Sequence, residues 1–347
     1  MLELWFVIAA VMLVAYVVLD GYDFGAGMVH LWVARNNEER RQVLAAIGPY
    51  WDGNEVWLLA AGGALFVAFP RVLSAGVSGF YFAIFLVLWC LILRGISIEF
   101  RSHVTDSMWR ATWDFVFAAA SLLLALFFGT ALGNLVRGVP LNEAGWFTLP
   151  LFTDFTPRGE VGILDWYTVG AGLLAVIALA AHGAAFLVWR TDGAVQQRAR
   201  MAARILSVVS QGLWVVMFLA TQSLNDVLTV LGSRPFGLLG VALAIGGIAA
   251  MHLGLARARE LMPFLGSSAF LAGTLIATAA CLFPVMLKSI DNPALSITVH
   301  SGGGDTAGLG TALGWFVVGL PLVVGYFVMN FRIHRGKAVA ARDGEGY

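Results

Sequence analysis

Charged side chains are scarce in this sequence of 347 residues. Only 12% of the residues are Asp, Glu, Lys or Arg, the formal net charge is zero, and 59% are hydrophobic. A protein that binds nucleic acid needs a basic surface, so a chain without excess positive charge is not expected to bind it. The mean hydropathy of +0.83 lies far outside the range of soluble proteins and predicts a helical protein that crosses a lipid membrane several times.

Cysteine and ligand motifs are equally sparse. Cys90 and Cys281 both lie within apolar runs, which excludes a disulfide framework and a CxxC metal or redox pair. His182 alone among the six histidines falls near the centre of an apolar segment, and no second His or Met stands at ligand spacing. We therefore expect no haem, no metal and no catalytic residue in this chain, and we expect His182 to form hydrogen bonds between helices.

A basic leader is lacking as well. The chain opens with MLELWF, and the apolar run continues to Asp20, whereas a cleaved signal peptide would open with a basic region. We therefore expect the first segment to remain as a helix. No soluble domain stands out, so residues 1–347 are predicted to form one integral membrane domain with a short, frayed polar tail over about 332–347.

Nine apolar segments are long enough to cross a bilayer as helices, and they predict an all-α polytopic membrane protein. The segments are 4–33, 51–69, 74–98, 113–136, 163–189, 203–223, 236–256, 264–287 and 311–331. Within them, pairs of glycines four residues apart predict close packing of helix backbones. These pairs are Gly21 and Gly25, Gly129 and Gly133, and Gly310 and Gly314.

Arg and Lys residues are distributed unevenly between alternate connections. Sixteen of the 21 fall on one side of the predicted bundle. The five on the other side are Arg71, Arg137, Arg158, Arg234 and Lys288. Because basic residues in short loops are retained on the cytoplasmic side, this distribution predicts an external N-terminus and a cytoplasmic C-terminus. An odd number of spans agrees with that orientation.

Acidic residues gather toward the basic side of the predicted bundle. Two pairs, one in DGYDFGAGM and one in WDGNEVW, are spaced three residues apart and so share a helical face. A carboxylate in a membrane helix is costly unless it is paired, hydrated or protonated, and such residues usually line a polar path. Carboxylates together with an imidazole can relay protons near neutral pH. The predicted proton path comprises Asp20, Asp23, Asp52, Glu55, Glu99 and His103.

Some of these acids also have simpler interpretations. Asp52 stands at a helix start, where an aspartate can serve as an N-cap. Glu99 is flanked by two arginines that could neutralise it in ion pairs. Asp114 and Asp165 also begin predicted helices, and we expect both to be N-caps.

Several strings carry a family resemblance. They are DGYDFGAGM, NNEERR, GPYWDGNEVWLLAAGGALFVAFP, LRGISIEFRSH and the tryptophans of MWRATWD. In this order and spacing the chain resembles subunit II of the cytochrome bd family of membrane quinol oxidases. The match is dense from Asp20 to Asp114 and looser afterwards, where the hydropathy profile and the string GNLVRGVPL agree.

The resemblance implies a fold of two four-helix bundles plus a peripheral helix. It implies a non-haem subunit of the bacterial cytoplasmic membrane, paired with a larger subunit I that holds haems b and d, oxidises quinol and reduces dioxygen to water. No firmly bound cofactor is implied for this chain itself. Some relatives hold a structural quinone in this subunit, and small single-span subunits are further partners that the resemblance allows.

The resemblance also assigns roles to individual residues. The aspartate of WDGN, here Asp52, would belong to a cytoplasmic proton path toward the haem site, Glu99 stands at a position where Asp is an alternative, and His103 stands where Lys is an alternative. A proton-coupled secondary transporter is the main rival hypothesis, but it should show repeated halves and a polar site at the midplane. A third hypothesis is a structural scaffold that keeps the haem subunit folded.

Overall fold

The computed structural model describes residues 1–157 and 159–340, apart from the side chains of residues 306 and 307. Within these residues, eight helices are long and apolar enough to cross a membrane, and a ninth span is formed if the bent pair α3–α4 is counted as one. The predicted polytopic all-α architecture is confirmed. The long helices are α1 (Leu2–Val33), α3 (Trp51–Ala68), α5 (Tyr81–Phe100), α6 (Ser107–Arg137), α7 (Trp166–Arg190), α8 (Gly193–Leu224), α10 (Pro235–Ala256), α11 (Leu261–Leu282) and α13 (Thr306–Ile333).

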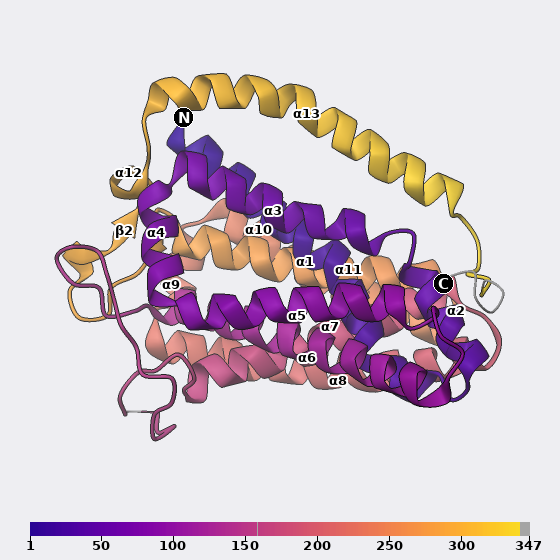
Figure 1. The fold of residues 1–347 in the computed structure, drawn as a ribbon. Coiled ribbons are helices and arrows are strands. Elements are labelled where there is room, and N and C mark those ends of the chain that lie inside the picture. Colours follow the sequence, from indigo (N-terminus) through magenta and orange to yellow (C-terminus); the bar gives the residue numbers. More distant parts are fainter. Residues whose placement is uncertain (158, 341–347) are drawn as a thin grey trace.

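The shorter elements gather at the two ends of the long helices (Figure 1). We call one end the basic end; it holds α2 (Asn37–Ile47), the turns after α5, α7 and α10, and the tail 334–340. We call the other the loop end; it holds α4 (Pro70–Gly79), α9 (Val227–Gly232), η1 (Pro293–Leu295), α12 (Val299–Gly302), the antiparallel strands β1 (Val285–Leu287) and β2 (Ile297–Thr298), and residues 138–157 and 159–165. Each long helix therefore runs from one end to the other.

Eight long helices form two packed groups. α1, α3, α5 and α6 contact one another in the first group, α7, α8, α10 and α11 do so in the second, and α7 joins the groups by packing on α1 and α6. This arrangement, with α13 outside both groups, matches the expected two bundles and a peripheral helix. Because α7 lies between the two groups, the part of it nearer the basic end, from Ala178 to Val188, is entirely buried.

Glycines set the closest helix contacts. Gly25 of α1 faces Gly183 of α7 so closely that neither position has room for a Cβ. Gly129 of α6 lies against Gly172 of α7 in the same way, so two of the three predicted glycine pairs lie in close contacts. α10 and α11 meet through four further glycines that the spacing rule did not single out. They are Gly240, Gly247, Gly266 and Gly273.

α13 lies apart from the bundles over most of its length (Figure 1). The prediction of close backbone packing at Gly310 and Gly314 is wrong, because no atom lies within 4 Å of a Cβ built at either position. Aromatic rings make the contacts instead: the Phe316 ring lies 6.2 Å from that of Trp5 in α1, and the Phe327 ring lies 5.8 Å from that of Trp57 in α3. The helix is thus peripheral, with most of its apolar surface uncovered by this chain.

Most of the predicted spans differ from the observed helices by a few residues, and α8 begins ten residues before its predicted span. In two cases the predicted span runs into another element. The segment 74–98 begins inside α4, which is bent by 118° from α3, and the crossing helix α5 starts only at Tyr81. Proline explains the break, since Pro70 lacks the N–H that would continue α3 and restricts the backbone of Phe69. The segment predicted to end at residue 287 ends as a helix at Leu282, and its last residues form β1.

Candidate functional site

Arg94 is the centre of a buried ionic cluster between α1, α3 and α5. Its side chain is fully buried, and its Nη1 donates to Asp20 Oδ1 at 2.6 Å while its Nη2 donates to Glu55. The guanidinium also lies over the Phe24 ring, 4.6 Å from the centroid. A buried charge is stable only when it is paired and hydrogen-bonded, so the two carboxylates allow an arginine to stand inside the apolar helix α5.

Asn54 of α3 extends this cluster to a second acid of α1. Its Nδ2 lies 2.7 Å from Asp23 Oδ2, 2.8 Å from Tyr22 Oη and 3.2 Å from the carbonyl oxygen of Leu19. Asn54, Asp23 and Tyr22 are all fully buried. We call Asp20, Asp23, Asn54, Glu55 and Arg94 together the Arg94 cluster.

The Arg94 cluster has more acids than cations. One guanidinium faces three carboxyl groups, and within the described residues the only hydrogen bond to the Asp23 side chain comes from a neutral amide. The second carboxyl oxygens of Asp20 and Asp23 accept no hydrogen bond from the described part of the chain. Such oxygens can receive a proton or a water molecule, which distinguishes this cluster from a closed structural ion pair.

The remaining predicted path residues lie at the surface of the chain. Asp52, the second residue of α3, is exposed and shares a helical face with Glu55, whose side chain is 27% exposed. Glu99 and His103 are exposed at the end of α5, where His103 Nδ1 lies 2.8 Å from the carbonyl oxygen of Glu99. The structure therefore brings Asp20, Asp23 and Glu55 into one cluster and leaves the other three outside it.

The alternative in which the flanking arginines neutralise Glu99 is wrong. Arg94 binds Asp20 and Glu55, and Arg101 binds Asp114 through both Nε and Nη2. Both arginines point into the protein, whereas Glu99 points out of it.

Asp114 is the second correction, because it is not an N-cap. α6 begins seven residues earlier at Ser107, with Asp106 as the capping residue that accepts from the Trp109 amide at 2.9 Å. Asp114 is instead buried inside α6. Asp165 does cap its helix, with hydrogen bonds from the amides of Tyr167 and Thr168, so that prediction is confirmed.

Asp114 gathers partners from three other segments. His30 Nε2 of α1 lies 3.0 Å from Oδ1, Arg40 Nη1 of α2 lies 2.6 Å from Oδ2, and Arg101 from the turn after α5 binds both oxygens. Arg101 also donates to Asn37 Oδ1 at 3.1 Å. We call His30, Arg40, Arg101 and Asp114 the Asp114 cluster. It ties α2 and the α5–α6 turn to the bundle at the basic end.

His182 forms hydrogen bonds between helices, as predicted. Its Nδ1 lies 2.7 Å from Ser267 Oγ of α11, and its Nε2 lies 2.9 Å from the carbonyl oxygen of Val18 in α1. Both ring nitrogens are therefore used in packing α7 against its two neighbours.

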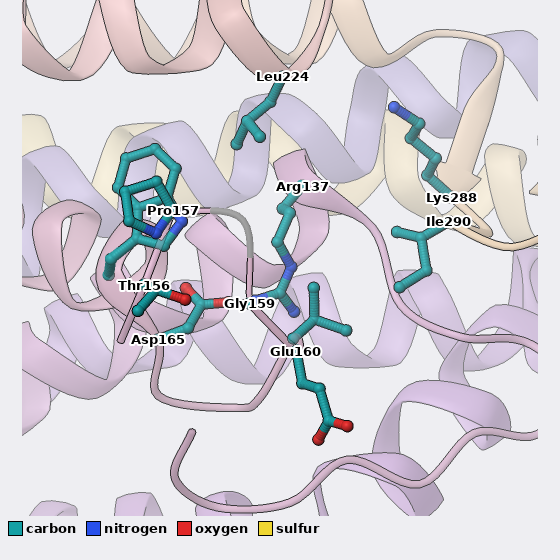
Figure 2. Close-up of a pocket in the computed structure, with 11 residues that line it drawn as sticks. Arg137, Thr156, Pro157, Gly159, Glu160, Asp165, Leu224, Lys288 and Ile290 are labelled. Atoms are coloured by element: carbon teal, nitrogen blue, oxygen red, sulfur yellow. Dashed lines mark hydrogen bonds and ion pairs between the residues drawn. The ribbon is translucent and has the colours of Figure 1, made fainter. Parts of the chain in front are cut away.

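A pocket of about 260 Å³ lies at the loop end, away from both clusters (Figure 2). Arg137, Asp165 and Lys288 line it, but Arg137 and Asp165 are bound to each other and Asp165 also caps α7. Lys288 donates to Asn225 Oδ1, and burial lowers the pKa of its ammonium group. These contacts join the ends of α6, α7 and α8 to the residue that follows β1, so they account for Arg137, Asp165 and Lys288 without a ligand.

The fold and the buried clusters define a class: a multi-pass α-helical membrane protein with ionisable groups held between its helices. Residues 1–334 match the family model of cytochrome bd terminal oxidase subunit II. The chain belongs to that family. The family is described as that of an oxidase subunit, which favours the oxidase hypothesis over a secondary transporter.

Individual relatives agree with this assignment. The chain is 31% identical over 336 residues to cytochrome bd ubiquinol oxidase subunit 2 of Bacillus subtilis (strain 168), covering 96% of this chain and 95% of that protein. It is 36% identical over 219 residues to cytochrome bd-I ubiquinol oxidase subunit 2 of Escherichia coli (strain K12), covering 61% of this chain and 56% of that protein. The match thus spans little more than half of the Escherichia coli relative.

A solved structure shares the fold. The bd oxidase structure from Geobacillus thermodenitrificans aligns with a TM-score of 0.76 at 19% identity, covering 96% of this chain and 98% of the matched chain. This likeness supports the arrangement of the helices.

Proposed function

We propose that this chain is the non-haem subunit II of a quinol:dioxygen oxidoreductase of the bacterial cytoplasmic membrane. In this proposal it pairs with a haem-bearing subunit I, supports that subunit structurally and contributes a proton-uptake path for the reduction of dioxygen to water. The observation that carries the proposal is the Arg94 cluster, a group of buried acids that begins one helical turn below the exposed Asp52. Family membership supplies the reaction, and the cluster supplies this chain's part in it.

The path would begin at Asp52 and continue along one face of α3 to Glu55. From there Arg94 joins Glu55 to Asp20, while Asp23 lies one turn nearer the basic end of α1, where Asn54 binds it. The guanidinium keeps its own proton, so its role is to hold the carboxylates in place while protons move between carboxyl groups and water. Glu99 and His103 are exposed near the same end and would act as surface groups that collect protons.

The charge balance of the Arg94 cluster supports a role in proton transfer. Three ionised carboxylates around one guanidinium would leave a net negative charge in a dry interior, which is costly. We infer that the cluster binds a proton at rest and exchanges it during turnover. A structural ion-pair network would have no reason to carry excess carboxyl groups.

The orientation of the path depends on the topology, and we propose that the basic end is cytoplasmic. A test places a single cysteine at Glu38 of α2 or at Glu143 of the loop end, both exposed, in a chain whose native cysteines are replaced. An impermeant thiol reagent added to intact cells should label the cysteine at 143 and should not label the one at 38. The reverse pattern would contradict the proposed direction of proton uptake.

The role of Asp52 is tested by Asp52→Asn. The N-cap alternative for Asp52 is wrong, because Tyr50 holds that position and no side chain caps α3. The exchange for an amide of the same shape should therefore leave assembly intact. If Asp52 carries protons, quinol-dependent oxygen uptake per haem should fall on the order of tenfold or more, since an amide cannot titrate. Asp52→Glu should retain part of the activity, because it keeps the ionisable group.

Asp106→Asn is the matched control for this test. It removes the same charge from the same end, and the new side chain can still cap α6. Normal turnover per haem in Asp52→Asn would exclude the relay role. Loss of haem from that variant would show instead that Asp52 supports the assembly.

The proposal also predicts where the haem resides. Expressed alone, this chain should bind no haem, and coexpressed with subunit I it should purify in mild detergent with a haem spectrum that belongs to the partner. A stoichiometric haem spectrum from the isolated chain would contradict this division of roles.

A further inference from the structure

The described part of the C-terminal tail is bound to the protein rather than frayed. Asn330 Nδ2 at the end of α13 donates to the carbonyl oxygen of Pro49 at 2.8 Å, and the Tyr50 hydroxyl donates to the carbonyl oxygen of His334 at 3.3 Å. The rings of Tyr50 and Phe331 stack with centroids 4.6 Å apart. Residues 330–338, which we call the clamp segment, therefore lie across the turn that leads into α3.

Arg190 holds this segment from the other side. It is the last residue of α7 and is 3% exposed. Its two terminal nitrogens donate to the carbonyl oxygens of His334 and Gly336 at 2.5 Å each, and its own carbonyl oxygen accepts from the Ala338 amide at 2.7 Å. The guanidinium also lies 5.6 Å from the centroid of the Tyr50 ring.

Lys337 adds a third attachment. Its ammonium group donates to the carbonyl oxygen of Trp189 at 2.9 Å and to Glu260 at 2.7 Å, at the start of α11. The Lys337 hydrogen bond lowers the pKa of the Glu260 carboxyl group, which keeps that carboxyl group ionised at neutral pH. The clamp segment thus joins the ends of α3, α7 and α11.

The turn under the clamp segment determines where Asp52 lies. Asp52 is exposed, and its side chain makes no hydrogen bond or ion pair within the described residues. Its position is therefore set by the backbone at the start of α3, which follows directly from Pro49 and Tyr50. Both residues are held by the clamp segment.

We propose that Arg190 and the clamp segment position Asp52 for proton entry, with Arg190 as the positioning residue. The inference rests on the proposed role of Asp52 as the entry group. A carboxylate on an unfixed helix start would sample many positions relative to Glu55 and its water, and small misplacements of reacting groups lower rates strongly.

Two variants release the clamp segment in different ways. Arg190→Gln removes the donors to both carbonyl groups. Gly336→Val strains the backbone, because Gly336 has a φ of +103°, which a β-branched residue avoids, while nothing lies within 4 Å of its Cβ position. The matched controls are Arg335→Gln, which removes a charge from an exposed residue of the same segment, and Gly325→Ala, at an open glycine of α13 with helical backbone.

The measurements are hydrogen exchange of the Ala338 amide and oxygen uptake per haem as a function of pH. Release of the clamp segment should speed hydrogen exchange at the Ala338 amide and lower oxygen uptake per haem by about threefold to tenfold. The loss should grow as the pH rises, because slower proton entry becomes limiting when protons are scarce. Arg190→Lys should recover part of the turnover. The other titratable groups in contact with the clamp segment are Tyr50, Glu260, His334 and Lys337, and both controls leave them unchanged.

Faster exchange at Ala338 with normal turnover and a normal pH profile would overturn the proposal, as would unchanged exchange in both variants. If the complex with Arg190→Gln loses its haem, the test rests on Gly336→Val, because that substitution alters only the turn at the surface. The two proposals fail in different ways. Normal turnover in Asp52→Asn would show that Asp52 carries no protons, so the underlying function would be wrong. Normal turnover in Arg190→Gln and Gly336→Val, together with an inactive Asp52→Asn, would contradict only the positioning role.

Discussion

The Arg94 cluster and the Asp114 cluster have opposite charge balances. In the first, one guanidinium faces the carboxyl groups of Asp20, Asp23 and Glu55, whereas in the second, one carboxylate faces two guanidinium groups and an imidazole. Both carboxyl oxygens of Asp114 accept hydrogen bonds, but Asp20 and Asp23 each keep an oxygen without a donor from the described chain. The comparison contrasts a junction whose carboxylate oxygens are both bound with a cluster that, in our proposal, binds and releases a proton.

The largest effect is expected for Arg94→Gln. Removing the only guanidinium of its cluster leaves buried carboxylates without a counter-charge, a change that costs about 3–5 kcal/mol in comparable buried pairs. We expect little assembled complex and a strongly lowered thermal midpoint. The measurement is the yield of haem-containing complex and its thermal unfolding.

Arg94→Lys is the control, since it keeps the charge but cannot bind both carboxylates in the same fork. An Arg94→Gln complex that assembles and unfolds like the wild type would show that the carboxyl groups are already neutral, and the charge contrast between the clusters would disappear.

Asp114→Asn should come next in magnitude. It leaves Arg101, which is 2% exposed, without its carboxylate, and the expected loss of stability is about 2–4 kcal/mol because some hydrogen bonds to the amide oxygen remain. Turnover per haem in the assembled fraction should stay near normal. A fall in turnover as large as that of a path variant would mean that the Asp114 cluster also carries protons.

Asp23→Asn should show the reverse pattern. In the part of the chain that the structure describes, its carboxyl group accepts only from Asn54, so a neutral side chain of the same shape should change stability by less than about 1 kcal/mol. Oxygen uptake per haem should fall by at least about tenfold if Asp23 transfers protons. Stability and turnover are measured on the same preparation, and a stable variant with full turnover would remove Asp23 from the path.

The smallest effect is expected at a surface pair. Glu39 of α2 binds Arg198 of α8, and this hydrogen bond lowers the pKa of the Glu39 carboxyl group. Because the pKa of Glu39 is lower in the folded protein, its ionised carboxylate stabilises the native state at pH values above the ordinary glutamate pKa of about 4.3. This contribution is lost as the pH falls through the lowered pKa of the folded state. Glu39→Gln should lower stability at neutral pH by about 0.2–1 kcal/mol. The difference from wild type should shrink in thermal unfolding at acid pH; a constant difference would contradict the assignment.

The long apolar segments were predictable because hydropathy is a local property of the sequence. The same holds for the cap at Asp165 and for the helix contact at Gly25, since a loop boundary and a spacing of four residues reveal them. The partners of Asp20 and Asp114 were not predictable. Asp20 pairs with a residue 74 positions away, and His30 lies 84 positions from Asp114. Spacing rules consider neighbours within a helical turn or two, so they suggested pairing for Glu99 that long-range packing prevents.

The position of an acid along its apolar segment predicted its surroundings only in part. An apolar segment shows that Asp20 and Asp23 lie inside the membrane, but it does not show that Asn54 and Tyr22 surround one of them. Nor did the polar tail suggest the clamp segment, because Arg190 binds backbone carbonyl groups, and these are present at every residue. A signal for this contact would have been the arginine at the end of an otherwise apolar α7.

The contact between Arg190 and the tail also imposes an order on the synthesis of the chain. Translation delivers Arg190 to the membrane well before its acceptor at His334, which lies 144 residues later. During that interval the Arg190 side chain lacks both carbonyl acceptors of the tail, and the turn before α3 lacks its hydrogen bonds with Asn330 and His334. A chain that ends before α13 would therefore contain Asp52, Glu55, Asp20 and Asp23 but not the contacts that, in our proposal, fix the start of α3.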